Sequence, residues 1–363
     1  MKVQKFFCES FRNIDRAEMA PHSGTNIIYG NNAQGKTNLI EGIWLFCGAK
    51  SFRSHHDNEL IEFGKEKAKL SMNFSAFGRD QEAEIFIDGR RSATLNGIKL
   101  KTAGELCGNF CAVVFSPVHL SLIKDGPATR RRMLDIAIGQ LYPSYVEALR
   151  GYNRAMQQRN AVLKDARYSS YIYDMLENFE GQMAHFGGII FSHREKYIHS
   201  LGEDIKRIYD EISGGKEELD IEYISDICGS SPKEAAESLA QGLKAARKED
   251  IIAGTTSNGP HREDLNFLLD KKAARSFGSQ GQQRSCVLSL KLAEAQVIKK
   301  TVGEEPVMLF DDVMSELDEG RQESILNRFS DMQVFVTCCE KEQLSRLKEG
   351  KTFRMDGGII EEE

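Results

Sequence analysis

One short stretch, IIYGNNAQGKTN from Ile27 to Asn38, constrains the fold more than any other part of the sequence. Apolar residues up to Tyr29 predict a buried strand that ends at Gly30, and the apolar spacing after Thr37 predicts a helix. The intervening letters match the phosphate-binding loop G-x-x-x-x-G-K-[ST], which belongs between a strand and a helix. The sequence therefore predicts an α/β nucleotide-binding domain built around a P-loop.

The residue types of this loop suit nucleotide phosphates. Gly30 and Gly35 permit backbone angles that let successive N–H groups turn toward an anion, and the following helix adds its positive end. We expect Lys36 to reach the β- and γ-phosphates of ATP and Thr37 to ligate Mg²⁺. The expected nucleotide contacts in the loop are Gly30, Asn31, Asn32, Ala33, Gln34, Gly35, Lys36 and Thr37.

A second motif, VMLFDD, lies near the other end of the chain. A buried strand that ends in a carboxylate is what Mg²⁺ coordination beside a P-loop requires. We expect Asp311 to hold the metal through water, because Mg²⁺ keeps part of its hydration shell. Asp312 is the expected catalytic residue that orients or deprotonates the attacking water, together with Lys36. Alone, the two acids would equally suit an ordinary solvated strand end.

The stretch SFGSQGQQRS, from Ser276 to Ser285, precedes apolar residues at helical spacing. Ser279 is a good N-cap, and Gly281 has no side chain to cover the first turn of the helix. A helix N-terminus of this kind either binds an anion or is simply capped, and the pattern leaves both possibilities open.

The organisation of the chain follows from the places of these motifs. Residues 1–120 are rich in strands, residues 121–249 are mainly helical, and residues 250–363 return to strands and helices. Because the P-loop and VMLFDD lie at opposite ends, we expect one ATPase head built from 1–120 and 250–363. The mainly helical second lobe, 121–249, would be inserted into it.

Composition limits the partners and the compartment. The net charge of −6 means that any contact with nucleic acid must come from a local basic patch. The first residues show no secretory pattern, and no apolar run approaches the length of a membrane span. The eight cysteines lack zinc-ligand spacing, so we expect reduced thiols and a cytoplasmic protein without a membrane partner.

Taken in order, the motifs GNNAQGKTN, GPATRRRMLD, QRNAVLK, GPHREDL, SQGQQRS and FDDVMSELD resemble those of the RecF family. This family comprises bacterial recombination and repair ATPases of the SMC-like branch of the ABC ATPase superfamily. The resemblance covers essentially the whole chain. SMC proteins would carry long coiled coils where this chain has a compact helical lobe.

The resemblance implies an ABC-type head whose ATP site is completed by a second copy. Ser279, Gly281 and Gln282 match the signature motif, which contacts the γ-phosphate bound to the other subunit. ATP would thus close a head-to-head homodimer. Arg12 matches an arginine that reaches the nucleotide, and Asp318 matches the loop along the dimer seam.

The resemblance also implies the biological role. The family binds DNA in an ATP-dependent way and hydrolyses ATP slowly. It works with RecO and RecR to load RecA at gapped DNA or single-/double-strand junctions, which supports replication restart and the SOS response. The expected cofactors are accordingly ATP and Mg²⁺.

Two motifs depart from the wider superfamily. Asp312 stands where many ABC ATPases carry glutamate, and its shorter side chain is consistent with slow turnover. Thr337 is followed by two cysteines and Glu340 where transporters carry a switch histidine, so Thr337 is the candidate replacement. His119 has no expected catalytic role.

For DNA, the best basic cluster is Lys124 with Arg130, Arg131 and Arg132; Lys99 and Lys101 form a second candidate. Such side chains meet phosphates without reading the base sequence. The alternative for this cluster is a solvated helix face, or an arginine bound to a carboxylate across the lobe.

Two other functions compete with a DNA-binding ATPase. One is a P-loop small-molecule kinase or metabolic NTPase, which would have no use for SQGQQ opposite a second P-loop. The other is an ABC subunit that drives a membrane partner, against which the missing switch histidine and the inserted lobe both argue.

Overall fold

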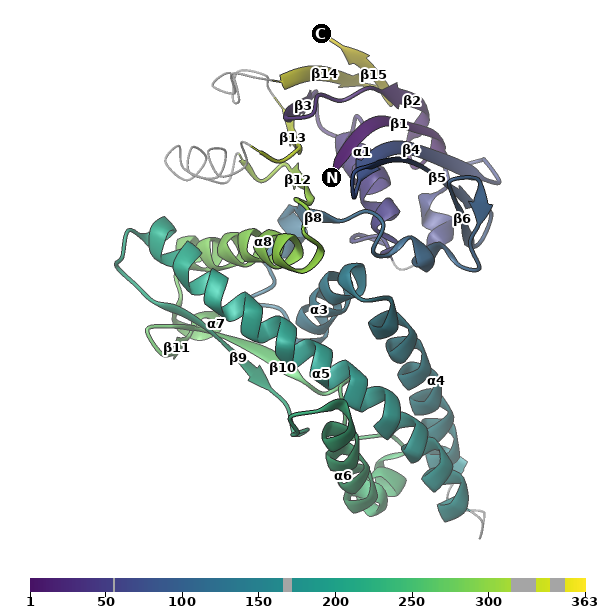
Figure 1. Ribbon diagram of the computed structural model, residues 1–363, viewed down its shortest axis with the longest axis vertical. Helices are drawn as coiled ribbons and strands as arrows, with labels where there is room; N and C mark the ends of the chain where they lie inside the picture. Colours follow the sequence, from purple (N-terminus) through teal and green to yellow (C-terminus); the bar gives the residue numbers. More distant parts are fainter. Residues whose placement is uncertain (55, 166–171, 315–330, 340–349) are drawn as a thin grey trace.

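The computed structural model describes residues 1–54, 56–165, 172–314, 331–339 and 350–363. Figure 1 shows two lobes: a head lobe of sheets that contains both chain termini, and a helical lobe that extends away from it. The predicted fold class is confirmed, because the chain forms an α/β ABC-type head from both of its ends together with a mainly helical second lobe.

The first sheet of the head lobe carries the P-loop strand. Its strand order is β15-β14-β3-β13-β12-β8, and its members are parallel except for the edge strand β15. The strands are β3 (Thr25–Tyr29), β8 (Ala112–Phe115), β12 (Val307–Asp311), β13 (Val334–Cys338), β14 (Gly350–Asp356) and β15 (Ile359–Glu362). Unbroken apolar runs such as VMLF suit a central parallel strand, which is buried on both faces. Since β3 and β12 are parallel, the residues that follow them meet at one edge.

The second sheet of the head lobe is antiparallel, with the order β2-β1-β4-β5-β6-β7. Its strands are β1 (Lys2–Phe11), β2 (Ile14–Met19), β4 (Ala68–Ala76), β5 (Arg79–Ile87), β6 (Arg91–Leu95) and β7 (Ile98–Lys99). Hairpin turns at Asp88-Gly89 and Asn96-Gly97 join β5 to β6 and β6 to β7. Helix α1 (Lys36–Trp44) packs between the two sheets, against β1 on one side and β12 and β13 on the other.

The helical lobe is built on one long helix, α5 (Ile172–Ser213), which packs against α4 and α6 (Figure 1). The other helices are α3 (Pro127–Leu141), α4 (Pro143–Asp165), α6 (Pro232–Ala253) and α8 (Gln280–Val302), of which α8 lies along α5 and against β8. A three-stranded antiparallel sheet, β11-β10-β9, covers α5 with β9 (Leu219–Ile224), β10 (Asp264–Leu269) and β11 (Lys272–Ala273). Short helices are η1 (Leu45–Cys47), η2 (Asp57–Leu60), η3 (Ala103–Leu106), α2 (Pro117–Leu120) and α7 (Ala274–Phe277).

The division into lobes stays a prediction, but the structure bears on its second boundary. The expected break between 249 and 250 falls inside α6, and β10 pairs with β9 along its whole length. Strand pairing of this kind is not visible in a single sequence, because it joins residues far apart in the chain. We therefore propose that the helical lobe extends through α7.

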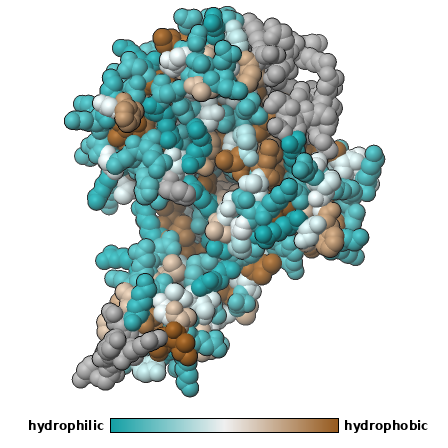
Figure 2. All heavy atoms as spheres, turned by 180° about the vertical axis from the view of Figure 1, so that it is seen from behind, coloured by the Kyte–Doolittle hydropathy of each residue, from teal (hydrophilic) through white to brown (hydrophobic). Residues whose placement is uncertain are grey.

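The face drawn in Figure 2 is mainly hydrophilic, and apolar side chains are recessed at the waist between the lobes. Among the described residues, no helix combines the length and the apolar character that crossing a membrane requires.

Candidate nucleotide-binding site

The P-loop between β3 and α1 has the backbone that its glycines predict. Gly30 has φ 151°, Ala33 has φ 65° and Gly35 has φ 112°. A Cβ atom on Gly30 would lie 2.2 Å from the carbonyl oxygen of Met355, so no larger residue fits there. Left-handed residues within such a turn form the concave backbone that anions occupy, and α1 begins directly behind it. The loop therefore fits a polyphosphate.

The loop is braced by a turn at the far end of the chain. The Oε1 atom of Gln34 accepts a hydrogen bond from the backbone N–H of Gly357 at 2.5 Å, and the N–H of Gly358 donates to the Gln34 carbonyl at 3.1 Å. Asn13 Nδ2 donates to the Ala33 carbonyl at 3.0 Å. Sequence reasoning missed this bracing, because no local pattern links Gln34 to residues more than three hundred positions away.

Lys36 and Thr37 occupy the first turn of α1. The Lys36 ammonium donates to the carbonyl oxygens of Gly30 and Asn31 at 2.5 and 2.8 Å, so its charge lies over the loop. The Thr37 hydroxyl donates to Asp311 Oδ1 at 2.7 Å. The structure thus brings together Thr37 and Asp311, the two expected metal ligands, which lie 274 positions apart in the chain. Two hard oxygen atoms in contact fit Mg²⁺, which takes oxygen ligands.

Asp311 ends β12 and is buried. Burial raises the pKa of its carboxyl group, while hydrogen bonds from the Thr37 and Thr337 hydroxyls oppose that rise. Thr337 Oγ1 donates to Asp311 Oδ1 at 3.1 Å and accepts the backbone N–H of Asp312 at 2.9 Å. The candidate replacement for the switch histidine therefore touches both acids. Asp318 and Glu340 lie outside the described residues.

Arg12, the expected N-terminal nucleotide contact, lies against α1. Its Nε and Nη2 atoms donate to the two carboxylate oxygens of the buried Glu41 at 3.0 and 2.9 Å. Its Nη1 atom donates to the Glu59 carbonyl at 2.6 Å. The guanidinium is thus engaged within the head lobe, and a contact with nucleotide stays a prediction.

Arg53 is a site residue that sequence reasoning missed. It donates to Asn38 Oδ1 at 2.7 Å, and its positive charge lowers the pKa of the Asp311 carboxyl group. It therefore lies within electrostatic reach of the metal ligands. The stretch SFRSHHDNELI, which contains Arg53, resembles the RecF family, but that resemblance assigned this arginine no role.

The predicted signature residues stand at the start of α8. Ser279 Oγ accepts the N–H of Gln282 at 3.3 Å, and the N–H of Ser279 donates to Gln282 Oε1 at 2.6 Å, which is a capping box. Gln282 Nε2 also donates to Glu217 at 2.5 Å. Within the described part of the chain, none of these bonds reaches the P-loop. Ser279 and Gly281 are exposed to solvent.

The predicted DNA cluster divides into buried and exposed members. Arg130 is buried, and its Nε and Nη2 atoms donate to Asp264 at 2.7 and 2.9 Å, which is the alternative in which an arginine is bound to a carboxylate. We leave Arg130 out of the proposed DNA contacts. Arg131 donates to the Glu263 carbonyl and Arg132 to the Ser51 carbonyl, each at 2.7 Å, while Lys124 is exposed. Lys99 and Lys101, beyond the β6–β7 turn, are exposed as well.

Comparison with known proteins decides the family. The family model of the RecF/RecN/SMC N terminal domain matches residues 2–361. The DNA replication and repair protein RecF of Clostridium acetobutylicum is 39% identical over 366 residues, which cover 100% of both chains. The chain belongs to the RecF family.

Solved structures agree with this assignment. The structure of the recombination mediator protein RecF-ATP in the RecFOR pathway has a TM-score of 0.92 and 34% identity, covering 100% of this chain and 97% of that one. The Smc head domain derived from Pyrococcus furiosus, bound to the C-terminal domain of ScpA, has a TM-score of 0.55 and 17% identity. The match covers 100% of this chain and 96% of the Smc chain. At 17% identity, it shows only that the two chains share a fold.

Proposed function

We propose that this RecF-family chain is an ATP-gated DNA-binding protein of recombinational gap repair. ATP closes a head-to-head homodimer on DNA, and slow hydrolysis releases it. One observation carries the proposal: the phosphate-binding groups and the signature serine lie in separate places on one chain. The P-loop offers Lys36 beside the Thr37–Asp311 pair, whereas Ser279 is exposed at α8 and makes no hydrogen bond to the loop within the described residues. A second copy supplies the missing groups.

Each residue of the site has a task in this proposal. The P-loop backbone from Gly30 to Gly35 receives the phosphates, and Lys36 neutralises the charge that develops on them. Thr37 and Asp311 hold Mg²⁺, which neutralises phosphate charge when bound. Asp312 orients or deprotonates the attacking water. Ser279, Gly281 and Gln282 act on the nucleotide of the partner subunit, and Arg12 reaches its own nucleotide after it releases Glu41.

Slow, DNA-stimulated turnover fits the short reach of Asp312. Its backbone is left-handed, with φ 52°, and its N–H is held by Thr337. The carboxylate can therefore change position only through its own two side-chain torsions. We propose that the closed dimer positions the attacking water beside Asp312, so that ATP is hydrolysed only after the dimer has formed.

The partners are proposed from the relatives. These are named as DNA replication and repair proteins, and a solved one is named as a mediator in the RecFOR pathway. We propose gapped DNA or single-/double-strand junctions as the nucleic acid, and RecR and RecO as partners in loading RecA, in support of replication restart and the SOS response in the bacterial cytoplasm. Lys124, Arg131, Arg132, Lys99 and Lys101 are the proposed phosphate contacts.

The main alternative is a P-loop NTPase or small-molecule kinase of metabolic role. Such an enzyme needs one complete site in each chain. Full-length similarity to RecF proteins and the exposed capping box of Ser279 both favour the dimeric switch instead.

Light scattering coupled to gel filtration tests the proposal. ATP with Mg²⁺ should roughly double the mass of the wild-type chain and strengthen its binding to gapped DNA. The matched control is Lys36→Met, which should stay monomeric because the phosphates lose their cationic partner. If ATP changes neither the mass nor the DNA affinity of the wild-type chain, the proposal fails.

A further inference from the structure

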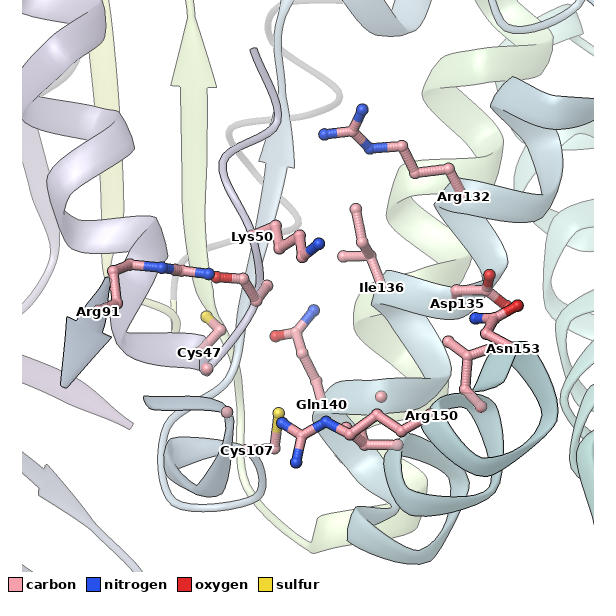
Figure 3. A pocket seen from close by; sticks show the side chains of 16 residues that line it. Cys47, Lys50, Arg91, Cys107, Arg132, Asp135, Ile136, Gln140, Arg150 and Asn153 are labelled. Atoms are coloured by element: carbon pink, nitrogen blue, oxygen red, sulfur yellow. The ribbon is translucent and has the colours of Figure 1, made fainter. Parts of the chain in front are cut away.

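A cavity of about 530 Å³ opens between the two lobes, away from the P-loop (Figure 3). The head lobe contributes the segment that follows α1, including Lys50, together with Arg91 from β6. The helical lobe contributes Arg132 and Gln140 from α3 and Arg150 from α4. Figure 3 shows the side chain of Lys50 directed into the space between these elements.

The lining of this cavity is strongly basic. It contains four cationic side chains, those of Lys50, Arg91, Arg132 and Arg150, and a single carboxylate, that of Asp135. Asp135 Oδ1 already accepts hydrogen bonds from Arg194 at 2.7 Å and from the Tyr145 hydroxyl at 2.5 Å. The one acid is therefore neutralised from outside the cavity.

Two of these cations lack a carboxylate partner. Within the described residues, Lys50 makes no side-chain hydrogen bond or ion pair, and Arg150 makes one long hydrogen bond, 3.3 Å, to the Thr102 hydroxyl. By contrast, Arg91 pairs with Asp57 at 2.9 Å. In the part of the chain that the structure describes, Lys50 and Arg150 therefore leave positive charge in the cavity without a carboxylate counterion.

Gln140 adds an independent observation. Its side chain is 1% exposed, and its Oε1 atom accepts the backbone N–H of Ala112 at 3.1 Å, which fixes the orientation of the amide. Its Nε2 atom is buried without a hydrogen-bond partner among the described residues, and Figure 3 shows it directed into the cavity toward Lys50. A buried donor without an acceptor is destabilising, and an acceptor atom that entered the cavity beside Lys50 would satisfy it.

The thiols of the lining do not offset the positive charge. Burial raises the pKa of Cys47 well above its usual value and that of Cys107 to about 11. Both groups are therefore uncharged near neutral pH.

We propose that this cavity binds a phosphate group, with Lys50, Gln140 and Arg150 as its principal donors. The donors come from different elements and directions, which suits the several oxygen atoms of a tetrahedral phosphate better than a planar carboxylate. The volume falls within the range of roughly 300–1,000 Å³ typical of small-molecule sites, so a nucleoside monophosphate fits. Because the donors belong to both lobes, the bound group ties the lobes together.

The phosphate has two sources, a free nucleotide or the DNA backbone, and the test separates them. The first arm titrates AMP and inorganic phosphate into the full-length Lys36→Met chain by calorimetry, since that change disables the P-loop. One site per chain is expected. Lys50→Ala and Arg150→Ala should each weaken it about tenfold, which is the effect of losing one charged hydrogen bond. Gln140→Glu should abolish binding, because it replaces the donor with a negative charge.

The second arm measures the affinity of the wild-type chain and the same cavity variants for gapped DNA. The matched control is Lys244→Ala, which removes an equal charge from an exposed site on α6. If AMP and phosphate fail to bind but Lys50→Ala and Arg150→Ala weaken DNA binding about tenfold while the control does not, the phosphate is that of DNA. If neither arm responds to these two changes, the cavity is not a phosphate site. Lys50 and Arg150 are both exposed, so replacing either one with alanine leaves no cavity in the hydrophobic core.

Discussion

At the scale of single residues, the Thr337 hydroxyl is the group that connects the two acids of the site. It donates to Asp311 and accepts the N–H of Asp312, so one side chain fixes the positions of two acids with different proposed tasks. Because β13 lies between β3 and β12, Thr337 also stands beside the strand that leads into the P-loop. We propose that a change in the phosphates bound at the loop reaches both acids through this hydroxyl.

Asp312→Asn separates nucleotide binding from hydrolysis. Asparagine tolerates the left-handed backbone that Asp312 adopts at φ 52°, so the fold should persist. We expect ATP-dependent dimers to form as in the wild-type chain, while single-turnover phosphate release slows by about a hundredfold or more, because a general base is lost. The control is Asp15→Asn, an exposed acid on β2. Unchanged turnover would show that another group handles the water.

Residues of the site differ in how far the sequence could predict them. Gly30, Lys36 and Thr37 follow from a local pattern, and Asp311 follows from a strand that ends in an acid. By contrast, the pairing of Arg12 with Glu41 and the burial of Arg130 depend on partners distant in the chain. A single sequence shows the residue type but not the partner, so it does not show which arginines are engaged within the fold.

Among the elements, α8 is the one whose start has a proposed role in a second subunit. Ser279 caps it, and Gly281 leaves open space above its first turn. The capping box uses the N–H groups of Ser279 and Gln282, and the positive end of the helix dipole lies at this exposed helix start. This geometry makes the surface of α8 sensitive to bulk and to positive charge.

Ser279→Arg should leave ATP affinity unchanged and block ATP-dependent dimerisation. The arginine adds bulk at the proposed seam and places a positive charge at the positive end of the helix. Ser279→Ala is the control, since it removes the same cap, at a cost of about 1 kcal/mol, without adding bulk. Fluorescent-nucleotide titration measures affinity, and light scattering measures mass. An arginine variant that still dimerises would refute the assignment of Ser279.

Helices and strands were more predictable than their packing. The apolar run at 307–310 forms a strand as expected, the run at 334–337 forms another, and the residues from Ile172 to Phe186 lie in a helix. That this helix continues to Ser213 follows from close packing: Cβ atoms on Gly187 and Gly188 would lie 2.3 Å from Leu239 and from the Pro232 carbonyl of α6. Glycines usually weaken a helix, but these two allow the neighbouring helix α6 to pack closely against α5.

Across the whole molecule, apolar cores stabilise both lobes, and both lobes also contain buried charges. In the helical lobe, these charges form a cluster on α4, α5 and α6. Arg159 of α4 is fully buried and pairs with Asp250 of α6 at 2.6 Å and with Glu180 of α5 at 3.0 Å. These contacts join three helices of the lobe that extends away from the head lobe (Figure 1). Stability and nucleotide binding should therefore respond separately to change.

Arg159→Leu tests this separation. Glu180 would keep its bond to Arg247. Within the described residues, the fully buried Asp250 would retain only the N–H of Ser257 as a side-chain partner. Removing one partner of a buried pair costs about 3–5 kcal/mol, so urea denaturation should show a matching loss of unfolding free energy. Nucleotide affinity should be unchanged, because none of these residues contacts the P-loop.

The control for that experiment is Arg154→Leu, an exposed arginine of the same helix, which should leave the unfolding free energy within about 0.5 kcal/mol of the wild type. Equal losses of unfolding free energy for both variants would mean that α4 is sensitive to any substitution, and that the loss does not come from the unpaired Asp250 carboxylate. If the Arg159→Leu chain were stable but bound ATP weakly, the ion pairs would instead affect ATP binding in the head lobe. The expected outcome, low stability with full affinity, assigns the buried charges to holding the helical lobe together and leaves ATP binding to the head lobe.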